Sequence, residues 1–184
     1  MAVAFDQGDN QGHGVHPRFK SVPARRLAMQ LINTAFAGKE PFSGPLPVSA
    51  ASRAVPSEST AGLLVTVALS HADGLRLNDT HTCNEQFRKL CCKAGDTAFG
   101  ARICTAATAA GCAKDADKKT VFNANVTIGT TADSIVVSVA ASEMDAAAAA
   151  GPATFVEFGL TDFPQCSVVN ALDIALGPFI LPVK

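Results

Sequence analysis

Apolar and polar residues are arranged in two different ways along this chain, and the change falls after residue 38. Residues 1–5 are a continuous apolar run, which is typical of a strand buried on both faces. The polar, glycine-rich segment 6–17 predicts a loop. A helix is predicted next, because Ser21 can cap it, Pro23 is tolerated in its first turn and Gly38 lies just beyond its end. Strand, loop and helix in this order form half of an α/β unit.

The predicted helix is amphipathic. Its apolar stripe consists of Leu27, Ala28, Leu31, Ile32 and Ala35. The polar residues Arg25, Arg26 and Gln30 lie off this stripe. In an amphipathic helix such a stripe is the face that packs against the rest of the protein.

The next part of the chain has a different character. Residues 39–61 are assigned to a linker, because Lys39 to Pro56 is rich in Pro, Ser and Gly. From residue 62 the sequence is typical of β-structure, with short apolar or alternating segments separated by turns. The predicted strands cover 62–69, 121–128, 135–140 and 154–160, with a turn at 72–75. In 121–128 the apolar residues point one way, and Asn125 points toward solvent.

Two stretches do not fit this β-pattern. Residues 105–119 are rich in Ala and Lys and are interpreted as an insertion. Residues 142–150 predict one or two helical turns, with Ser142 as the cap. The predicted fold is therefore an α/β fragment, the last strand and helix of a larger domain (1–38), a linker (39–61), and a mainly-β, sandwich-like domain (62–184).

Composition narrows the possible partners. The chain has 184 residues and a formal net charge of −1, so charge gives no reason to expect nucleic acid or an anionic membrane as partner. No apolar run reaches the roughly 18 residues that cross a bilayer. Trp and Tyr are absent, so only Phe can stack on a sugar ring.

Six cysteines and two glycosylation sequons point to an oxidising, lumenal compartment. The disulfide candidates are Cys83, Cys91, Cys92, Cys104, Cys112 and Cys166. The sequons begin at Asn78 and Asn125. Residues 1–5 lack the basic flank of a signal peptide, so a secreted or lysosomal protein is expected only if the chain lacks its natural beginning. Six free thiols in a cytosolic protein are the alternative.

His16 is the candidate catalytic residue. In open parallel sheets, loops at the carboxyl ends of strands form the active site, and the loop that holds His16 is in that position. An imidazole can act as a general base near neutral pH, and Asp6 or Asp9 can orient it. An ordinary loop histidine is the alternative. No Gly is followed two positions later by Ser, so the sequence contains no nucleophile elbow.

Neither a metal nor a cofactor is expected. His81 and Cys83 lie two positions apart, but no second pair of ligands matches a zinc pattern.

Short blocks near both ends of the chain carry a family resemblance. At the start they are Met1-Ala2-Val3-Ala4-Phe5-Asp6, Val15-His16-Pro17-Arg18-Phe19-Lys20, Arg26-Leu27-Ala28 and Phe42-Ser43-Gly44-Pro45-Leu46-Pro47. At the end they are Phe155-Val156-Glu157-Phe158, Pro164-Gln165-Cys166, Asn170 and Leu176-Gly177-Pro178-Phe179. In these blocks, in their order and in the pair Cys91-Cys92, the chain resembles the sialate O-acetylesterase family of SGNH-type carbohydrate esterases. The resemblance spans nearly the whole chain but covers residues 93–120 poorly.

The resemblance implies that the protein removes O-acetyl groups from sialic acids or related sugars. His16 would be the base of a Ser-His pair, with the serine and the oxyanion-hole donors in a catalytic part that precedes residue 1. The expected partners are therefore an O-acetylated sugar and the missing N-terminal catalytic part. By itself the chain is expected to be inactive. Two alternatives remain open, namely a secreted, non-enzymatic β-sandwich that binds glycans or proteins, and an incomplete gene model.

Overall fold

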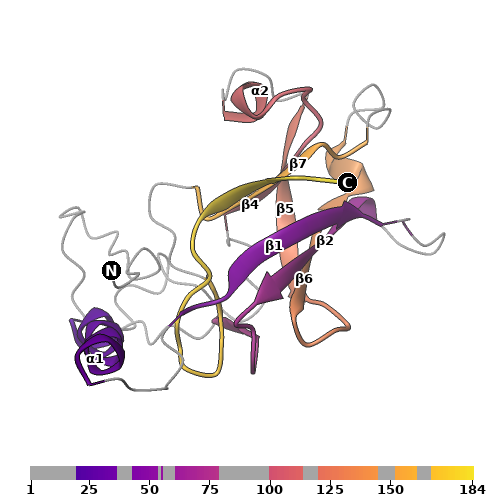
Figure 1. The fold of residues 1–184 in the computed structure, drawn as a ribbon. Coiled ribbons are helices and arrows are strands. Elements are labelled where there is room, and N and C mark those ends of the chain that lie inside the picture. Colours follow the sequence, from indigo (N-terminus) through magenta and orange to yellow (C-terminus); the bar gives the residue numbers. More distant parts are fainter. Residues whose placement is uncertain are drawn as a thin grey trace, which may run out of the picture.

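The structure is a computed structural model, and it describes residues 20–36, 43–53, 55, 61–78, 100–113, 120–144, 152–160 and 167–184. The strand predicted at 1–5 lies outside these residues. The helices are α1 (Ser21–Ala35), the short α2 (Ala109–Ala113) and the 3-10 turn η3 (Ala141–Glu143). The strands are β1 (Leu46–Ser52), β2 (Ala61–Ser70), β3 (Arg76–Asn78), β4 (Ala101–Cys104), β5 (Val121–Ile128), β6 (Ser134–Ala140), β7 (Phe155–Phe158), β8 (Ser167–Val169) and β9 (Phe179–Pro182). Figure 1 shows their arrangement.

Seven strands form one curved sheet whose two edges nearly meet. The strand order is β1-β2-β6-β5-β4-β7-β9, and each hydrogen-bonded neighbour is antiparallel. At the edges, the backbone N–H of Ser52 donates to the carbonyl of Lys184 at 3.0 Å, and the N–H of Lys184 donates to that of Ala50 at 3.0 Å. Figure 1 shows the yellow C-terminal strand beside the purple β1. The mainly-β prediction for residues 62–184 is confirmed, and the sheet is barrel-like.

The core lies inside this curved sheet. It is built from small and medium apolar side chains on alternate positions of the strands, because successive side chains of a strand point to opposite faces. Among its fully buried members are Val65, Val67, Ile103, Ile135, Val137, Val139, Val156 and Phe158. The rings of Phe158 and Phe179 stack with centroids 5.7 Å apart. Burying side chains of this size typically stabilises a fold by about 1.5–3 kcal/mol each.

The alternation predicted for residues 121–128 is confirmed in β5. Phe122, Ala124 and Val126 are buried, whereas Asn125 and Thr127 are exposed. The turn predicted at 72–75 is also present, with the N–H of Leu75 donating to the carbonyl of Ala72. Gly74 has φ +64°, which favours glycine because it has no Cβ.

Residues 46–52 correct the sequence analysis, because this part of the assigned linker is strand β1. Proline is tolerated only at the margin of a sheet, since it lacks an N–H for the ladder. β1 is such a margin, and its pairing with β2 shifts register between Pro47 and Ser49. Nothing in the composition of 39–61 marks β1 as a strand. Its pairing partners lie on the next strand, from Val65 opposite Ser52 to Ser70 opposite Leu46, beyond the reach of a local pattern. The domain boundaries at 38 and 61 remain a prediction.

Two short helical elements lie in the stretches that did not fit the β-pattern, and the structure describes each stretch only in part. Where residues 142–150 predict helical turns, the described part is η3, and Ala140 rather than Ser142 is its N-cap residue, without a side-chain cap. Within 105–119 the structure describes α2, which is tied to β4 by a disulfide between Cys104 and Cys112. In the part of the chain that the structure describes, no helix is long and apolar enough to cross a bilayer.

The helix predicted after residue 20 is confirmed as α1, but its cap is not. Lys20 is the N-cap residue, no side chain caps the helix, and Ser21 is its first helical residue. Because residues 1–5 are outside the description, the assignment of 1–38 to an SGNH-like domain remains a prediction.

Candidate functional site

α1 turns its predicted apolar stripe toward solvent. Its apolar stripe is exposed, with Leu27 at 57%, Leu31 at 59% and Ile32 at 50% of their full accessibility. Arg26, which lies off the stripe, is the buried residue of the helix at 4%. The sequence could not reveal this, because it shows which face of a helix is apolar but not which surface is near it.

A pair of hydrogen bonds explains the burial of Arg26. Its Nη2 donates to the backbone carbonyl oxygen of Asp173 at 2.7 Å, and its Nε donates to the same oxygen at 3.3 Å. A guanidinium suits this role because it is planar. The N–H groups along one of its edges therefore point in fixed directions, and two of them can reach the same oxygen. Asp173 has φ +60°, a conformation that aspartate tolerates better than most residues. The contact joins the helix to the last part of the chain.

The Asp173 carboxylate adds two surface ion pairs to the same place. It accepts from Arg76 and lies 3.5 Å from Nη1 of Arg25. The side chains of all three are about half exposed, so water screens these pairs. Exposed pairs of this kind contribute about 0–1 kcal/mol each. Among these described contacts, the buried guanidinium of Arg26 therefore contributes more to the attachment of α1 than the exposed charges do.

Asn170 ties three separate segments together beside this contact. Its Nδ2 donates to the carbonyl oxygens of Ser43 at 3.0 Å and His71 at 3.3 Å. Its Oδ1 accepts the backbone N–H groups of Leu172 and Ile174, both at 3.1 Å. Asn170 is 4% exposed, and both the Nδ2 and the Oδ1 of its amide have hydrogen-bond partners. We call the meeting point of α1, residues 43–46 and the loop 170–177 the junction.

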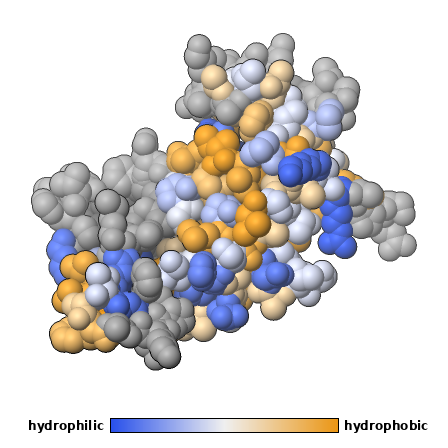
Figure 2. All heavy atoms as spheres, in the orientation of Figure 1, coloured by the Kyte–Doolittle hydropathy of each residue, from blue (hydrophilic) through white to orange (hydrophobic). Residues whose placement is uncertain are grey.

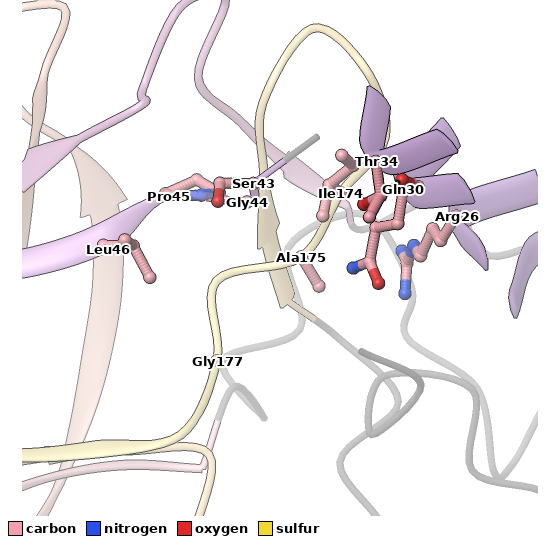
Figure 3. Close-up of a pocket in the computed structure, with 10 residues that line it drawn as sticks. All are labelled: Arg26, Gln30, Thr34, Ser43, Gly44, Pro45, Leu46, Ile174, Ala175 and Gly177. Carbon is pink, nitrogen blue, oxygen red and sulfur yellow. Dashed lines mark hydrogen bonds between the residues drawn. The ribbon is translucent and has the colours of Figure 1, made fainter. Parts of the chain in front are cut away.

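The junction encloses a cavity of about 330 Å³ that is partly open to solvent. Its lining residues come from the helix, the start of β1 and the loop: Arg26, Gln30, Thr34, Ser43, Gly44, Pro45, Leu46, Ile174, Ala175 and Gly177. Figure 3 shows the helical side chains on one side, residues 43–46 on the other, and Ala175 and Gly177 on the loop between them.

The described lining residues supply hydrogen-bond donors and acceptors, and none of them is an acid, a histidine or a cysteine. These residues can hold a small polar group. Gly44 allows the close approach that forms the cavity, because a Cβ at this position would overlap the carbonyl oxygen of Ala175. A Cβ at Gly177 would meet nothing within 4 Å.

The residues predicted to be catalytic lie outside the described part of the chain. They are His16, Asp6 and Asp9. Among the described residues, no group of three or more His, Cys, Asp or Glu could hold a metal ion. In the sequence Arg26 was identified only as a polar residue off the helical stripe and as part of a family-like block, and Asn170 only as part of such a block. No local pattern revealed that both belong to the junction.

The structure describes both predicted glycosylation sites and two of the six cysteines. Asn125 is exposed on β5, and Asn78 is half-buried on β3, where it pairs with Ser167. The disulfide joins Cys104 and Cys112, whose Cα atoms are 5.8 Å apart. The other disulfide candidates, Cys83, Cys91, Cys92 and Cys166, lie outside the described residues.

A second buried charge lies on the sheet. Glu157 of β7 is fully buried and accepts from Nε of Arg102 on β4 at 2.8 Å, with Nη2 of the same arginine at 2.7 Å. The two residues are direct cross-strand partners. Oε1 of Glu157 has no hydrogen-bond partner among the described residues. Glu157 lies within the strand predicted at 154–160, but nothing in the sequence indicated that its side chain would be fully buried.

Comparison with known proteins shows a relationship in fold. No protein-family model and no curated protein sequence matches this chain. The crystal structure of a novel carbohydrate acetylesterase from Xanthomonas citri matches with a TM-score of 0.59 and 18% sequence identity. The match covers 97% of this chain and 31% of that chain. The chain therefore has the fold of less than one third of a longer protein, and at this identity the likeness concerns the fold alone.

Proposed function

We propose that this chain is the His-bearing part of an enzyme that hydrolyses O-acetyl esters on sugars, with sialic acids or related sugars as its substrates. The observation that carries the proposal is the fold match, which extends over 97% of the chain to a carbohydrate acetylesterase. The sequence blocks that resemble sialate O-acetylesterases support the same class, because a resemblance in residues is separate evidence from a likeness in fold.

In the proposed mechanism His16 acts as the general base. It would remove the proton of a serine hydroxyl, which attacks the acetyl carbonyl and forms an acyl-enzyme. The protonated imidazole would then give its proton to the sugar oxygen as the sugar leaves. Next, His16 would activate a water molecule that releases acetate. Asp6 or Asp9 would hold the imidazole in the required tautomer. The serine would come from polypeptide outside these 184 residues.

We also propose that the protein is secreted or lysosomal. Two sequons and the disulfide between Cys104 and Cys112 support a secreted or lysosomal protein, since disulfides persist mainly in oxidising compartments.

The test compares His16→Ala with His13→Ala in the product of the complete gene, with an O-acetylated sialic acid and a nitrophenyl acetate as substrates. We expect His16→Ala to lower kcat by several powers of ten, as triad deletions do, and His13→Ala to lower it less than tenfold. The readout is acetate release. Equal activity of the His16→Ala protein and the unchanged protein would rule out the mechanism. Activity on acetylated xylan but not on the sialic acid would retain the esterase and reject the substrate.

A further inference from the structure

One stripe of α1 is polar and forms a wall of the junction cavity. The stripe consists of Arg26, Gln30 and Thr34, which all line the cavity. Residues four apart in a helix lie one above the other, so the three side chains make a continuous row. Arg26 is buried, Gln30 half-buried and Thr34 exposed, so the row runs from the interior toward the surface. Figure 2 shows hydrophobic side chains of α1 at the lower left, on another side of the helix.

Most of the remaining side chains of the lining are aliphatic. They belong to Pro45, Leu46, Ile174 and Ala175. In Figure 3, Pro45 and Leu46 lie across the cavity from the helix that carries the polar row. The cavity therefore has a polar side and an apolar side. A mostly apolar wall with a few placed polar groups is typical of small-molecule sites, and about 330 Å³ is at the small end of their range.

The polar row has the chemistry that hydroxyl groups require. A hydroxyl both donates and accepts a hydrogen bond, and the carboxamide of Gln30 offers a donor and an acceptor together. The hydroxyl of Thr34 donates to the backbone carbonyl oxygen of Gln30 at 2.8 Å, and its oxygen can still accept. The guanidinium of Arg26 adds N–H donors at the inner end of the row.

Hydrogen bonds hold the two sides of the cavity in place. Nη2 of Arg26 binds the carbonyl oxygen of Asp173 at 2.7 Å, which fixes the polar side to the loop. Asn170 binds the carbonyl oxygen of Ser43 and the N–H of Ile174, which fixes the other side to the same loop. A ligand would not have to order these segments, and a preformed site loses less free energy on binding.

We propose that the junction cavity binds one pyranose ring of a neutral sugar, at a place separate from the catalytic residues. A pyranose ring carries hydroxyls around its edge and C–H groups on its faces, so it matches both sides of the cavity. Trp and Tyr are absent from the chain, so aliphatic side chains would contact the C–H face. The inference rests on the proposed function for the source of the sugar, which would be a unit of the glycan that carries the ester.

The experiment uses photoaffinity labelling of the product of the complete gene. The probe is a galactopyranoside with a small diazirine group, and unmodified methyl β-galactopyranoside is the competitor. Mass spectrometry identifies the labelled peptides, so label in the cavity is distinguished from label at any other sugar site. The variants are Gln30→Leu and Thr34→Val. The matched control is Asn123→Leu, because Asn123 carries the same amide group and is exposed on β5, away from the lining.

We expect label on the peptides that contain Leu46 or Ala175, and we expect the competitor to remove it. Each variant should raise the competitor concentration needed for half displacement roughly two- to tenfold, as the loss of one hydrogen bond does. Asn123→Leu should leave that concentration unchanged. Circular dichroism checks that the variants are folded. Thr34→Val decides the matter if Gln30→Leu does not fold, because Thr34 is exposed and valine keeps its shape.

Three results would overturn the proposal. They are no label on either peptide, the same displacement in both folded variants as in the unchanged protein, and stronger competition by N-acetylneuraminic acid, which would reject a neutral sugar. The outcomes also separate this site from the proposed function. Label in the cavity of a protein without acetylesterase activity would retain the sugar site and reject the enzyme. An active acetylesterase without this label would do the reverse.

Discussion

The guanidinium of Arg26 donates two hydrogen bonds to the backbone carbonyl oxygen of Asp173, although 147 residues separate them in the sequence. This contact decides which face of α1 is free. The junction around it joins the helix, the start of β1 and the loop 170–177. The stability of the junction can be tested on the 184-residue chain itself, without any substrate or partner.

Arg26→Ala should loosen α1 from the loop 170–177. The change removes both hydrogen bonds, and bonds that involve a charged group contribute about 1.5–3 kcal/mol. We expect faster amide hydrogen exchange throughout α1, with little change in β2 and β6. The matched control is Arg25→Ala, since Arg25 is exposed and touches only the Asp173 carboxylate among the described contacts, so its loss should shift stability by less than about 1 kcal/mol. Unchanged exchange in α1 of the Arg26→Ala protein would contradict the assigned role.

Asn170→Asp should destabilise the whole junction even though the side chain keeps its shape. The substitution replaces the Nδ2 donor by an oxygen that faces the carbonyl oxygens of Ser43 and His71. Leaving buried polar groups unmatched costs about 1–3 kcal/mol per group, and more for a charge. Urea unfolding should show a lower midpoint. The same exchange at Asn123, which is exposed on β5, should leave the midpoint within about 0.5 kcal/mol.

Gly44→Ala and Gly177→Ala should have opposite effects, although both residues line the same cavity. A Cβ at position 44 would overlap the carbonyl oxygen of Ala175, so the backbone would have to move, at a cost of about 1–3 kcal/mol. A Cβ at position 177 would meet nothing, and the unfolded chain would lose entropy, so a gain of about 0.4–1 kcal/mol is expected. Thermal unfolding of the two variants gives the comparison. Equal melting temperatures would show that the approach of Gly44 to Ala175 is loose in solution.

Arg102→Met should be more harmful alone than together with Glu157→Leu. The single change leaves the fully buried Glu157 carboxylate without its partner, and breaking a buried pair in this way typically costs 3–5 kcal/mol. The double change removes both charges and fills the space with apolar atoms, which is often neutral or stabilising. A double-mutant cycle by urea denaturation measures the coupling. Additive effects of the two substitutions on the free energy of unfolding would contradict a coupling between Arg102 and Glu157.

Asn125 and Asn78 should differ as glycan acceptors if the protein passes through the secretory pathway. Asn125 and Thr127 are exposed together on β5, whereas Asn78 is half-buried in β3. We expect Asn125→Gln to remove the mass shift that a glycosidase produces, and Asn78→Gln to leave it. A glycan mapped to Asn78 alone by peptide mass spectrometry would reverse this assignment.

Local patterns in the sequence predicted individual elements well. The alternation in 121–128 matches β5 and its buried face, and the Asp73-Gly74 turn is where it was expected. The helix after residue 20 was also correct in place and in the identity of its apolar stripe. Strand alternation, the helical period and turn residues each depend on residues only a few positions apart. A local stretch of sequence is therefore enough to predict these features.

What the tertiary structure alone decided are the features that depend on residues far apart. β1 is a strand because it pairs with β2, which lies beyond the reach of a local pattern, and the fully buried Glu157 has its charged partner Arg102 on a separate strand. α1 shows its apolar face to solvent because Arg26 meets Asp173 across most of the chain. A hydrophobic pattern records how much apolar surface an element has to bury. The direction in which that surface points is set by contacts whose free energy appears only after folding brings distant segments together.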